Sequence, residues 1–144
     1  MTTNSATSEK NLDWALLVLR LVLAAVFISH GHQKLFGMGI SGVTGFFTNI
    51  GVPLAGVFAP FVSLLEFVGA IALLFGAFTR VTALLLACDM LGAIIFVHAK
   101  NGFSAPKGVE MVLGNFGMLV AVALVGAGAY SIDALLSRRN APTP

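Results

Sequence analysis

Charged residues are scarce in this sequence. Asp, Glu, Lys and Arg make up 10% of its 144 residues, whereas a typical soluble domain contains about 25% of them. Hydrophobic residues account for 58% of the chain, and its mean hydropathy is +0.96. Too few polar side chains remain to cover the surface of a water-soluble globule. The composition therefore predicts an integral membrane protein, with the lipid bilayer as its solvent.

The small numbers of cysteine and basic residues exclude further classes of function. The single cysteine, Cys88, can neither form an internal disulfide nor perform dithiol exchange, and we expect it to be a small buried apolar side chain. No Cys/His cluster has zinc-type spacing, so no metal site is expected. The net charge is only +2 and no basic stripe is present, which argues against a nucleic-acid partner.

Four apolar segments approach the length of about 20 residues that crosses a bilayer. They are roughly Trp14–Phe36, Phe58–Phe78, Val81–His98 and Val109–Gly128. The fold class predicted is therefore all-α, a four-helix transmembrane bundle. We expect one membrane domain over residues 12–136, with a disordered polar tail over 1–11 and a polar C-terminal tail over 137–144.

The connection between the first two spans is long enough for structure of its own. Its apolar residues follow the i, i+3, i+4, i+7 spacing of a helix, and they are Val43, Phe46, Phe47 and Ile50. Gly51 and Pro53 then end the pattern. A short interfacial helix is favoured over an irregular loop. The connection at residues 78–80 is so short that spans two and three must form a tight antiparallel hairpin.

The distribution of basic residues predicts the orientation. Four spans place both termini on one side, and the basic residues of that side are Lys10, Arg80, Arg138 and Arg139. The opposite side holds Lys34, Lys100 and Lys107. Because cytoplasmic loops carry the excess of Lys and Arg, the termini are predicted to be cytoplasmic.

Polar residues concentrate in the outer half of the predicted bundle, at 1.5 Å of rise per residue. These candidates for a ligand-binding or proton-handling site are His30, Lys34, Glu66, His98 and Glu110. Glu66 is the most constrained, because a carboxylate inside a bilayer needs a partner or a proton. We expect it to face the bundle interior, within reach of Lys34, His30 or Glu110. A structural ion pair with Lys34 and a role in ligand or proton handling both stay open.

The remaining polar residues have simpler interpretations. Arg20, Arg80 and Asp89 are expected to be structural; Arg20 either reaches the inner headgroups or pairs inside the bundle. Asp89 and His98 lie nine residues apart, on opposite faces of a straight helix, so they share a pocket only if span three bends. His30 and His98 could be axial haem ligands from two spans, but ordinary hydrogen bonding is favoured over haem.

A series of short motifs resembles those of the DoxX family of membrane proteins. His30–Gly37 resembles its HGxxKLFG signature, Gly51-Val52-Pro53 its G-[IV]-P, Glu66–Gly69 its ExxG, and Gly76–Arg80 its G-x-x-T-R turn. The positions Met90, Ala93, His98, Gly102 and Phe103 fit its third-helix pattern. Gly108–Glu110 resembles its G-x-E, and Gly128–Asp133 its closing G-x-x-S-x-D. The resemblance runs in order from about residue 14 to residue 134.

This resemblance implies a multi-pass protein of the bacterial inner (plasma) membrane. The family is often labelled as oxidoreductases or quinone-linked subunits, through kinship with the small membrane subunit of thiosulfate–quinone oxidoreduction. The family positions that carry over as a site are His30, Lys34, Glu66, His98 and Glu110. Asp89 does not belong to the pattern, so no role is inherited there.

The leading hypothesis is a subunit of a membrane redox complex that holds a quinone or another small ligand. It has no intrinsic cofactor, is at most a quinone-linked oxidoreductase subunit, and depends on a soluble or membrane redox enzyme for electrons. His30, Lys34 or His98 would hydrogen-bond a quinone oxygen, while Glu66 or Glu110 would handle the proton. The alternatives are a small proton-coupled transporter for a weak acid, which would require a homo-oligomer, and a membrane scaffold for soluble enzymes.

Overall fold

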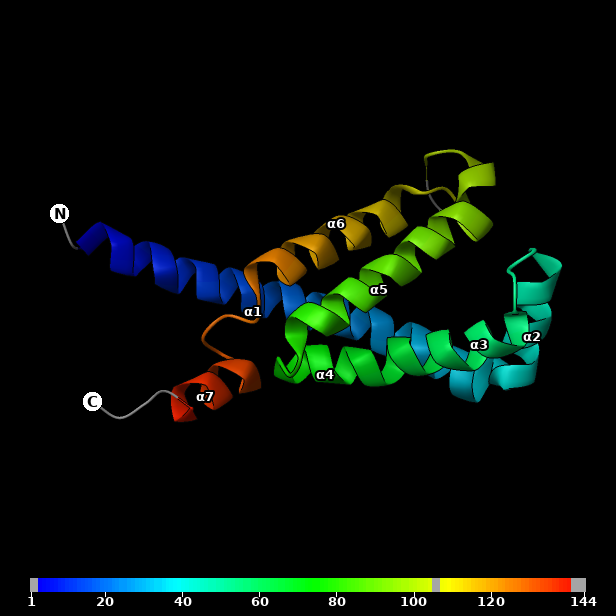
Figure 1. Cartoon of the computed structure of the whole chain (residues 1–144). Helices are drawn as coiled ribbons and strands as arrows, with labels where there is room; N and C mark the ends of the chain where they lie inside the picture. The colour runs from blue at the N-terminus through cyan, green and yellow to red at the C-terminus, as the bar shows by residue number, and fades with distance from the viewer. Residues whose placement is uncertain (1–2, 105–106, 141–144) are drawn as a thin grey trace.

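The computed structural model describes residues 3–104 and 107–140. Helical segments packed side by side run back and forth along one long axis, and both chain ends lie at the same end of the bundle (Figure 1). The all-α prediction is confirmed, and the described residues contain no strand. We call the end that holds the chain termini the terminal end and the opposite end the pocket end.

The first helical run is longer than the sequence predicted. It consists of α1 (Thr3–His32), the π-helical η1 (Gln33–Met38) and α2 (Gly39–Asn49). Residues 3–11, expected to be a disordered tail, are helical, because each residue added to an existing helix gains a hydrogen bond without a new nucleation cost. Residues 1–2 lie outside the described residues.

The helix predicted around residues 43–50 is confirmed as α2. Gly39, with φ of +70°, turns the chain between η1 and α2, so that α2 stands across the pocket end (Figure 1). Gly51, with φ of +80°, follows the end of α2.

The second and third runs form the predicted tight hairpin. The second contains α3 (Ala55–Leu64), the π-helical η2 (Leu65–Gly69) and α4 (Ala70–Phe75). The third contains α5 (Thr79–Ala93), the π-helical η3 (Ile94–His98) and the 3₁₀ turn η4 (Ala99–Asn101). Gly76 and Phe78 make the turn with φ of +68° and +50°.

The chain then returns through α6 (Glu110–Val125), which α7 (Ile132–Arg139) follows. Residues 137–139 of the predicted polar tail belong to α7, whereas residues 141–144 lie outside the described residues. Within the described residues, three helical runs are long and apolar enough to cross a membrane, namely Ala6–Asn49, Ala55–Phe75 and Thr79–Asn101. The apolar α6 has 16 residues, about 24 Å at 1.5 Å per residue, somewhat less than the hydrocarbon core.

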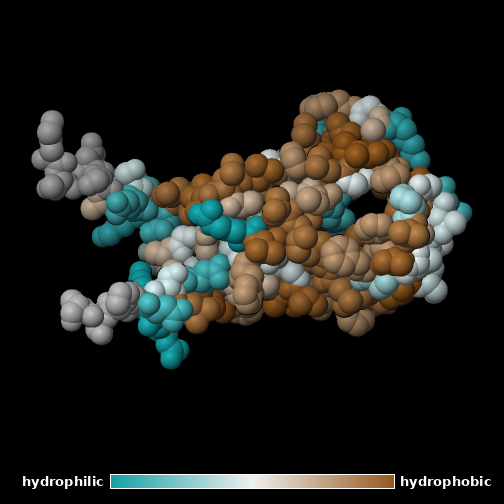
Figure 2. Space-filling view, in the orientation of Figure 1, coloured by the Kyte–Doolittle hydropathy of each residue, from teal (hydrophilic) through white to brown (hydrophobic). Residues whose placement is uncertain are grey.

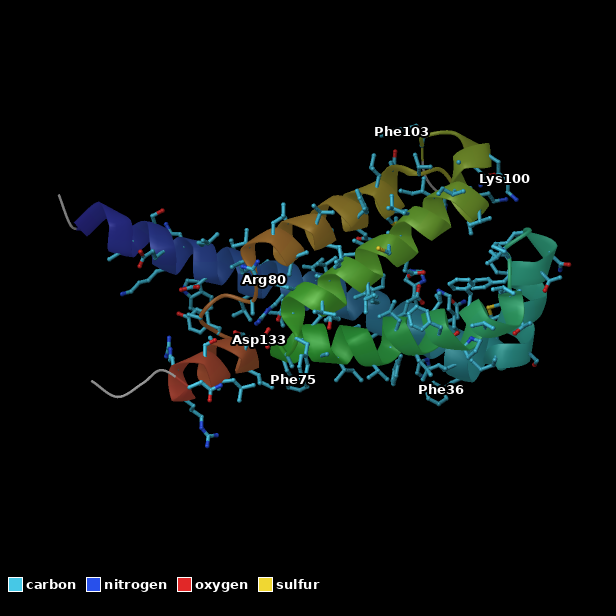
Figure 3. The ribbon with its side chains drawn as sticks, in the orientation of Figure 1. Phe36, Phe75, Arg80, Lys100, Phe103 and Asp133 are labelled. Atoms are coloured by element: carbon cyan, nitrogen blue, oxygen red, sulfur yellow. The ribbon has the colours of Figure 1, made fainter. Side chains whose placement is uncertain are left out.

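The surface agrees with a membrane protein. Hydrophobic residues cover most of the middle of the molecule, and polar residues gather at its two ends (Figure 2). Phe36 and Phe75 point away from the helices (Figure 3) and are 67% and 58% exposed. In a bilayer these side chains face lipid.

The hydrophobic core has two parts. The larger part joins α1, α4, α5 and α6 and includes Leu23, Phe27, Leu73, Leu86 and Leu119. The smaller part joins α2 to α3 and consists of Val43, Phe47, Ala55, Ala59 and Val62. Because the two parts are separate and α5 diverges from α3 toward the pocket end (Figure 1), the bundle is splayed there.

Polar side chains close the terminal end by bonding the backbone. Arg20 is buried, and its Nη2 donates to the carbonyl oxygen of Tyr130 at 2.6 Å. Asp133, labelled in Figure 3, accepts from the backbone N–H groups of Phe78 and Thr79 at 2.8 and 2.9 Å. Arg80 Nη2 donates to the carbonyl oxygen of Val125 at 3.1 Å. Of the two interpretations of Arg20, the structure therefore supports bonding inside the bundle.

Candidate functional site

An ion pair lies inside the bundle toward the pocket end. Lys34, in η1, donates from Nζ to Oε2 of Glu66, in η2. The Glu66 side chain is 4% exposed and the Lys34 side chain 21% exposed. The prediction that Glu66 faces the interior and reaches Lys34 is confirmed. Its physical basis is that a carboxylate turned toward lipid at this depth would lack any compensating charge.

A glycine brings the two partners together. Gly31, one turn before Lys34, packs so closely on η2 that a Cβ placed there would lie 2.5 Å from the backbone nitrogen of Phe67. Phe67 follows Glu66 directly in the sequence. The close approach of the two backbones thus lets the side chain of Lys34, in η1, reach the carboxyl group of Glu66 in the neighbouring run.

Asp89 completes a cluster of three charged groups. It lies on α5, and its carboxyl group faces that of Glu66 closely enough for a side-chain hydrogen bond, with Lys34 near enough to attract it. Its Oδ2 atom is buried and has no hydrogen-bond partner among the described residues. We call Lys34, Glu66 and Asp89 the charged trio. From the sequence, Asp89 was expected to be a structural polar residue and was not grouped with Glu66.

The charged trio borders a cavity of about 430 Å³, a size that suits a small-molecule site. Its walls come from α1, η1, α2, α3, η2, α5, η3 and α6, and most of them are apolar. The aromatic residues in the walls are Phe46, Phe47, Phe58, Phe61 and Phe96. Figure 2 shows an opening at this end of the molecule. The cavity therefore combines an apolar interior with one strongly polar region.

Each π-helical segment in the described part of the chain contributes a polar residue to this cavity. Lys34 belongs to η1, Glu66 to η2 and His98 to η3. π-Helical turns are rare, and they occur frequently at functional sites because they redirect side chains at a cost in backbone hydrogen bonding. The fact that these segments meet at one cavity supports a functional site there. This evidence is independent of the charges of the side chains.

The π-helical turn also explains why Asp89 and His98 line the same cavity. A straight α-helix would place them on opposite faces, so a shared pocket was expected only if span three bends. The change from α5 to η3 at Ile94 alters the rotation per residue and so removes that constraint. His98 is held in place by Nδ1, which lies 2.9 Å from the carbonyl oxygen of Lys107.

The other candidates divide into those near the cavity and those away from it. His30 lines the cavity beside Lys34. Glu110 is exposed at the start of α6 and is not among the lining residues, so the structure does not join it to Glu66. Cys88, expected to be buried, is exposed and lines the cavity next to Asp89, because α5 turns this face away from the core.

The chemistry of the site follows from its donors and acceptors. Lys34, His30 and His98 provide N–H donors for a carbonyl or an anionic oxygen. Glu66 and Asp89 can accept or give a proton. Among the described residues, no group of three His, Cys, Asp or Glu side chains could hold a metal ion. The arrangement suits an apolar molecule with one oxygen-bearing end.

Comparison with known proteins gives the family. The DoxX family model matches residues 15–99, which is more than half of the chain. The chain belongs to the DoxX family. Its motifs now have places in the structure, since the HGxxKLFG segment supplies Lys34 and the ExxG segment supplies Glu66 to the same ion pair.

Relatives match along most of the chain. The inner membrane protein YqjF of Escherichia coli is 36% identical over 91% of this chain and 98% of its own length. The protein named "Putative oxidoreductase CatD" in Bacillus subtilis is 34% identical over 87% of this chain and 89% of its own length. An uncharacterized membrane protein of Mycobacterium tuberculosis is 32% identical over 87% and 83%. No solved structure matches the chain.

Proposed function

We propose that this DoxX-family protein is the ligand-binding membrane subunit of a redox complex, and that its cavity holds a quinone or a similar small molecule. The observation that carries the proposal is the cavity itself, which is walled by apolar and aromatic side chains and has the charged trio at one side. The ring and tail of a quinone suit the apolar walls, and its oxygens suit the polar side.

The residues of the chain would bind and orient such a ligand. Lys34 and the two histidines, His30 and His98, are the donors available to a ligand oxygen, and Glu66 and Asp89 are the groups that exchange a proton with it. A quinone, when bound, supplies a carrier of two electrons and two protons. The electrons would come from a soluble or membrane redox enzyme, in keeping with the oxidoreductase name given to CatD.

We further propose that the protein resides in the bacterial inner membrane, as the name of YqjF states for that relative, with both termini in the cytoplasm. The basic residues at the terminal end, among them Arg80, Arg138 and Arg139, support this orientation through the positive-inside rule. The cavity then opens in the outer half of the bilayer.

Ligand binding tests the proposal directly. The protein is placed in lipid nanodiscs, and the affinity for a short-tailed ubiquinone and a short-tailed menaquinone is measured by titration calorimetry. We expect saturable binding of at least one of them, and binding at least about tenfold weaker in Lys34→Met and Glu66→Gln, since each substitution removes a charge-assisted contact. Glu110→Gln is the matched control, because that carboxylate lies outside the cavity.

Failure of both quinones to bind the wild-type protein would overturn the quinone proposal. Equal losses in Glu66→Gln and Glu110→Gln would overturn the assignment of the site to this cavity.

A proton-coupled transporter for a weak acid is a second candidate, favoured by the burial of the charged trio inside a membrane bundle. Four helices are few for a complete pathway, so this function would require a homo-oligomer. Uptake of a weak acid into reconstituted vesicles, lost in Glu66→Gln but retained in Glu110→Gln, would favour transport over redox work.

A further inference from the structure

Two carboxyl groups and one ammonium group meet inside the bundle, at one side of the cavity. Glu66 is 3% exposed, and the Asp89 carboxyl lies within hydrogen-bonding reach of it. Glu66 Oε2 accepts from Lys34, whereas the buried Asp89 Oδ2 has no donor among the described residues. A carboxylate oxygen is an acceptor only. Two ionised carboxylates would therefore face each other here without a donor between them.

The net charge of the trio indicates that one proton is needed to neutralise it. With all three groups ionised, the charged trio carries a net charge of −1 inside the bundle. An unbalanced charge in a region of low dielectric is very costly. One proton placed between Glu66 and Asp89 makes the trio neutral and also provides the missing donor.

Among the described residues that line the cavity, Lys34 is the one Lys or Arg. The titratable groups that face it from the neighbouring elements are His30 of α1, Cys88 of α5 and His98 of η3. Arg20 and Arg80 lie at the terminal end, where they bond Tyr130 and Val125.

We propose that Glu66 and Asp89 form a carboxyl–carboxylate pair that stores one proton at neutral pH and presents it to the cavity. Asp89 is then the proton-handling residue that the family motifs do not reveal, while Glu66 anchors the pair to Lys34. The use of the stored proton rests on the proposed function, because the proton would be passed to an oxygen of the bound ligand. Its test, in contrast, needs no ligand.

Infrared spectroscopy can count the stored protons, since a protonated carboxyl group has a carbonyl stretch that an ionised one lacks. The full-length protein is measured in nanodiscs at neutral pH, and spectra of variants are subtracted from the wild-type spectrum. We expect one protonated carboxyl band in the wild type. The band should be lost in Asp89→Asn and in Glu66→Gln, because in each case Lys34 balances the single carboxylate that remains.

Lys34→Met gives the sharpest outcome. Without the ammonium group, neutrality requires both carboxyls to be protonated, so the band should double in area. Lys34→Arg keeps the cation and should keep a single band, and Glu110→Gln should leave the spectrum unchanged.

Absence of the band in the wild type would overturn the proposal, and so would its survival in both Asp89→Asn and Glu66→Gln. Because these spectra are recorded without a ligand, quinone binding can fail while the stored proton is found. Equally, a quinone can bind to a protein whose three groups prove to be fully ionised.

Discussion

The two ends of the bundle both bury charged side chains, but they use them differently. At the terminal end, Arg20 and Asp133 bond backbone groups of neighbouring segments. At the pocket end, Lys34 and Glu66 bond each other, beside Asp89 and a cavity. A backbone group has a fixed position and cannot be exchanged for a ligand atom. Whether a buried charged side chain bonds a backbone group or another side chain is therefore a better indicator of its role, structural or functional, than its burial.

Packing shows the same contrast. A Cβ added to Gly76 at the terminal end would lie 2.0 Å from Nη1 of Arg20, so no space is left there. The pocket end contains the cavity of about 430 Å³ and all three π-helical segments. The cavity thus lies at the pocket end and tight packing around Arg20 at the terminal end, so substitutions at the two ends should separate stability from ligand binding.

Gly76→Ala should be the most damaging small change, and it tests the terminal end. Alanine would adopt a left-handed conformation at φ of +68° and overlap the Arg20 guanidinium. We expect a loss of about 2–5 kcal/mol in the free energy of unfolding, from backbone strain and overpacking together. Gly51→Ala is the control, because Gly51 also has positive φ, of +80°, but nothing lies within 4 Å of its added Cβ. Denaturation in detergent measures both, and equal losses would show that overlap with Arg20 is unimportant.

Gly31→Ala tests the backbone contact that joins Lys34 to Glu66. Its Cβ would lie 2.5 Å from a backbone atom of Phe67, which cannot move aside as a flexible side chain would. We expect α1 and η2 to separate, with a loss of about 1–3 kcal/mol in stability and weaker quinone binding. Gly117→Ala, where an added Cβ meets nothing within 4 Å, should change neither quantity. Unchanged binding in Gly31→Ala would mean that the ion pair does not depend on this contact.

Asp133→Ala should reduce stability and leave the pocket end intact. It removes the acceptor for two N–H groups at the start of α5, a loss comparable to that of a helix N-cap, about 0.5–2 kcal/mol. Because Asp133 lies at the opposite end from the cavity, we expect the affinity for a quinone to stay within twofold of wild type. Thermal unfolding and calorimetry on the same sample provide both values. A large fall in affinity would contradict the separation of the two ends.

The position of Glu66 and the hairpin between the second and third runs could be predicted from the sequence. The inward position of Glu66 and its pairing with Lys34 follow from the cost of a charge in lipid, and the hairpin at residues 78–80 follows from its length. The shared cavity of Asp89 and His98 was not predicted, because a 100° rotation per residue does not hold through η3. The π-helical segments η1, η2 and η3 were not predicted, because hydrophobic periodicity distinguishes a helix from a strand and does not mark a single π-helical turn.

Glu66→Leu should have the smallest effect on stability and the largest effect on ligand binding. Leucine fills much of the volume of the carboxyl side chain, and Lys34 keeps Asp89 as its counter-charge. Replacing one buried charge while the others stay balanced often leaves stability nearly unchanged, so we expect a difference within about 1 kcal/mol. Quinone affinity should nevertheless fall at least about tenfold, because the polar side of the cavity loses an acceptor.

The double variant Glu66→Leu/Asp89→Leu sharpens this test, since Lys34 is then left without a counter-charge. Removing the partner of a buried charge costs about 3–5 kcal/mol, so the double variant should unfold far more easily than Glu66→Leu alone. If Glu66→Leu were as unstable as Gly76→Ala, the ion pair between Lys34 and Glu66 would have a structural role, like the bonds at the terminal end. If both variants were as stable as the wild type, Lys34 would reach solvent or a headgroup and the charged trio would not act as a unit.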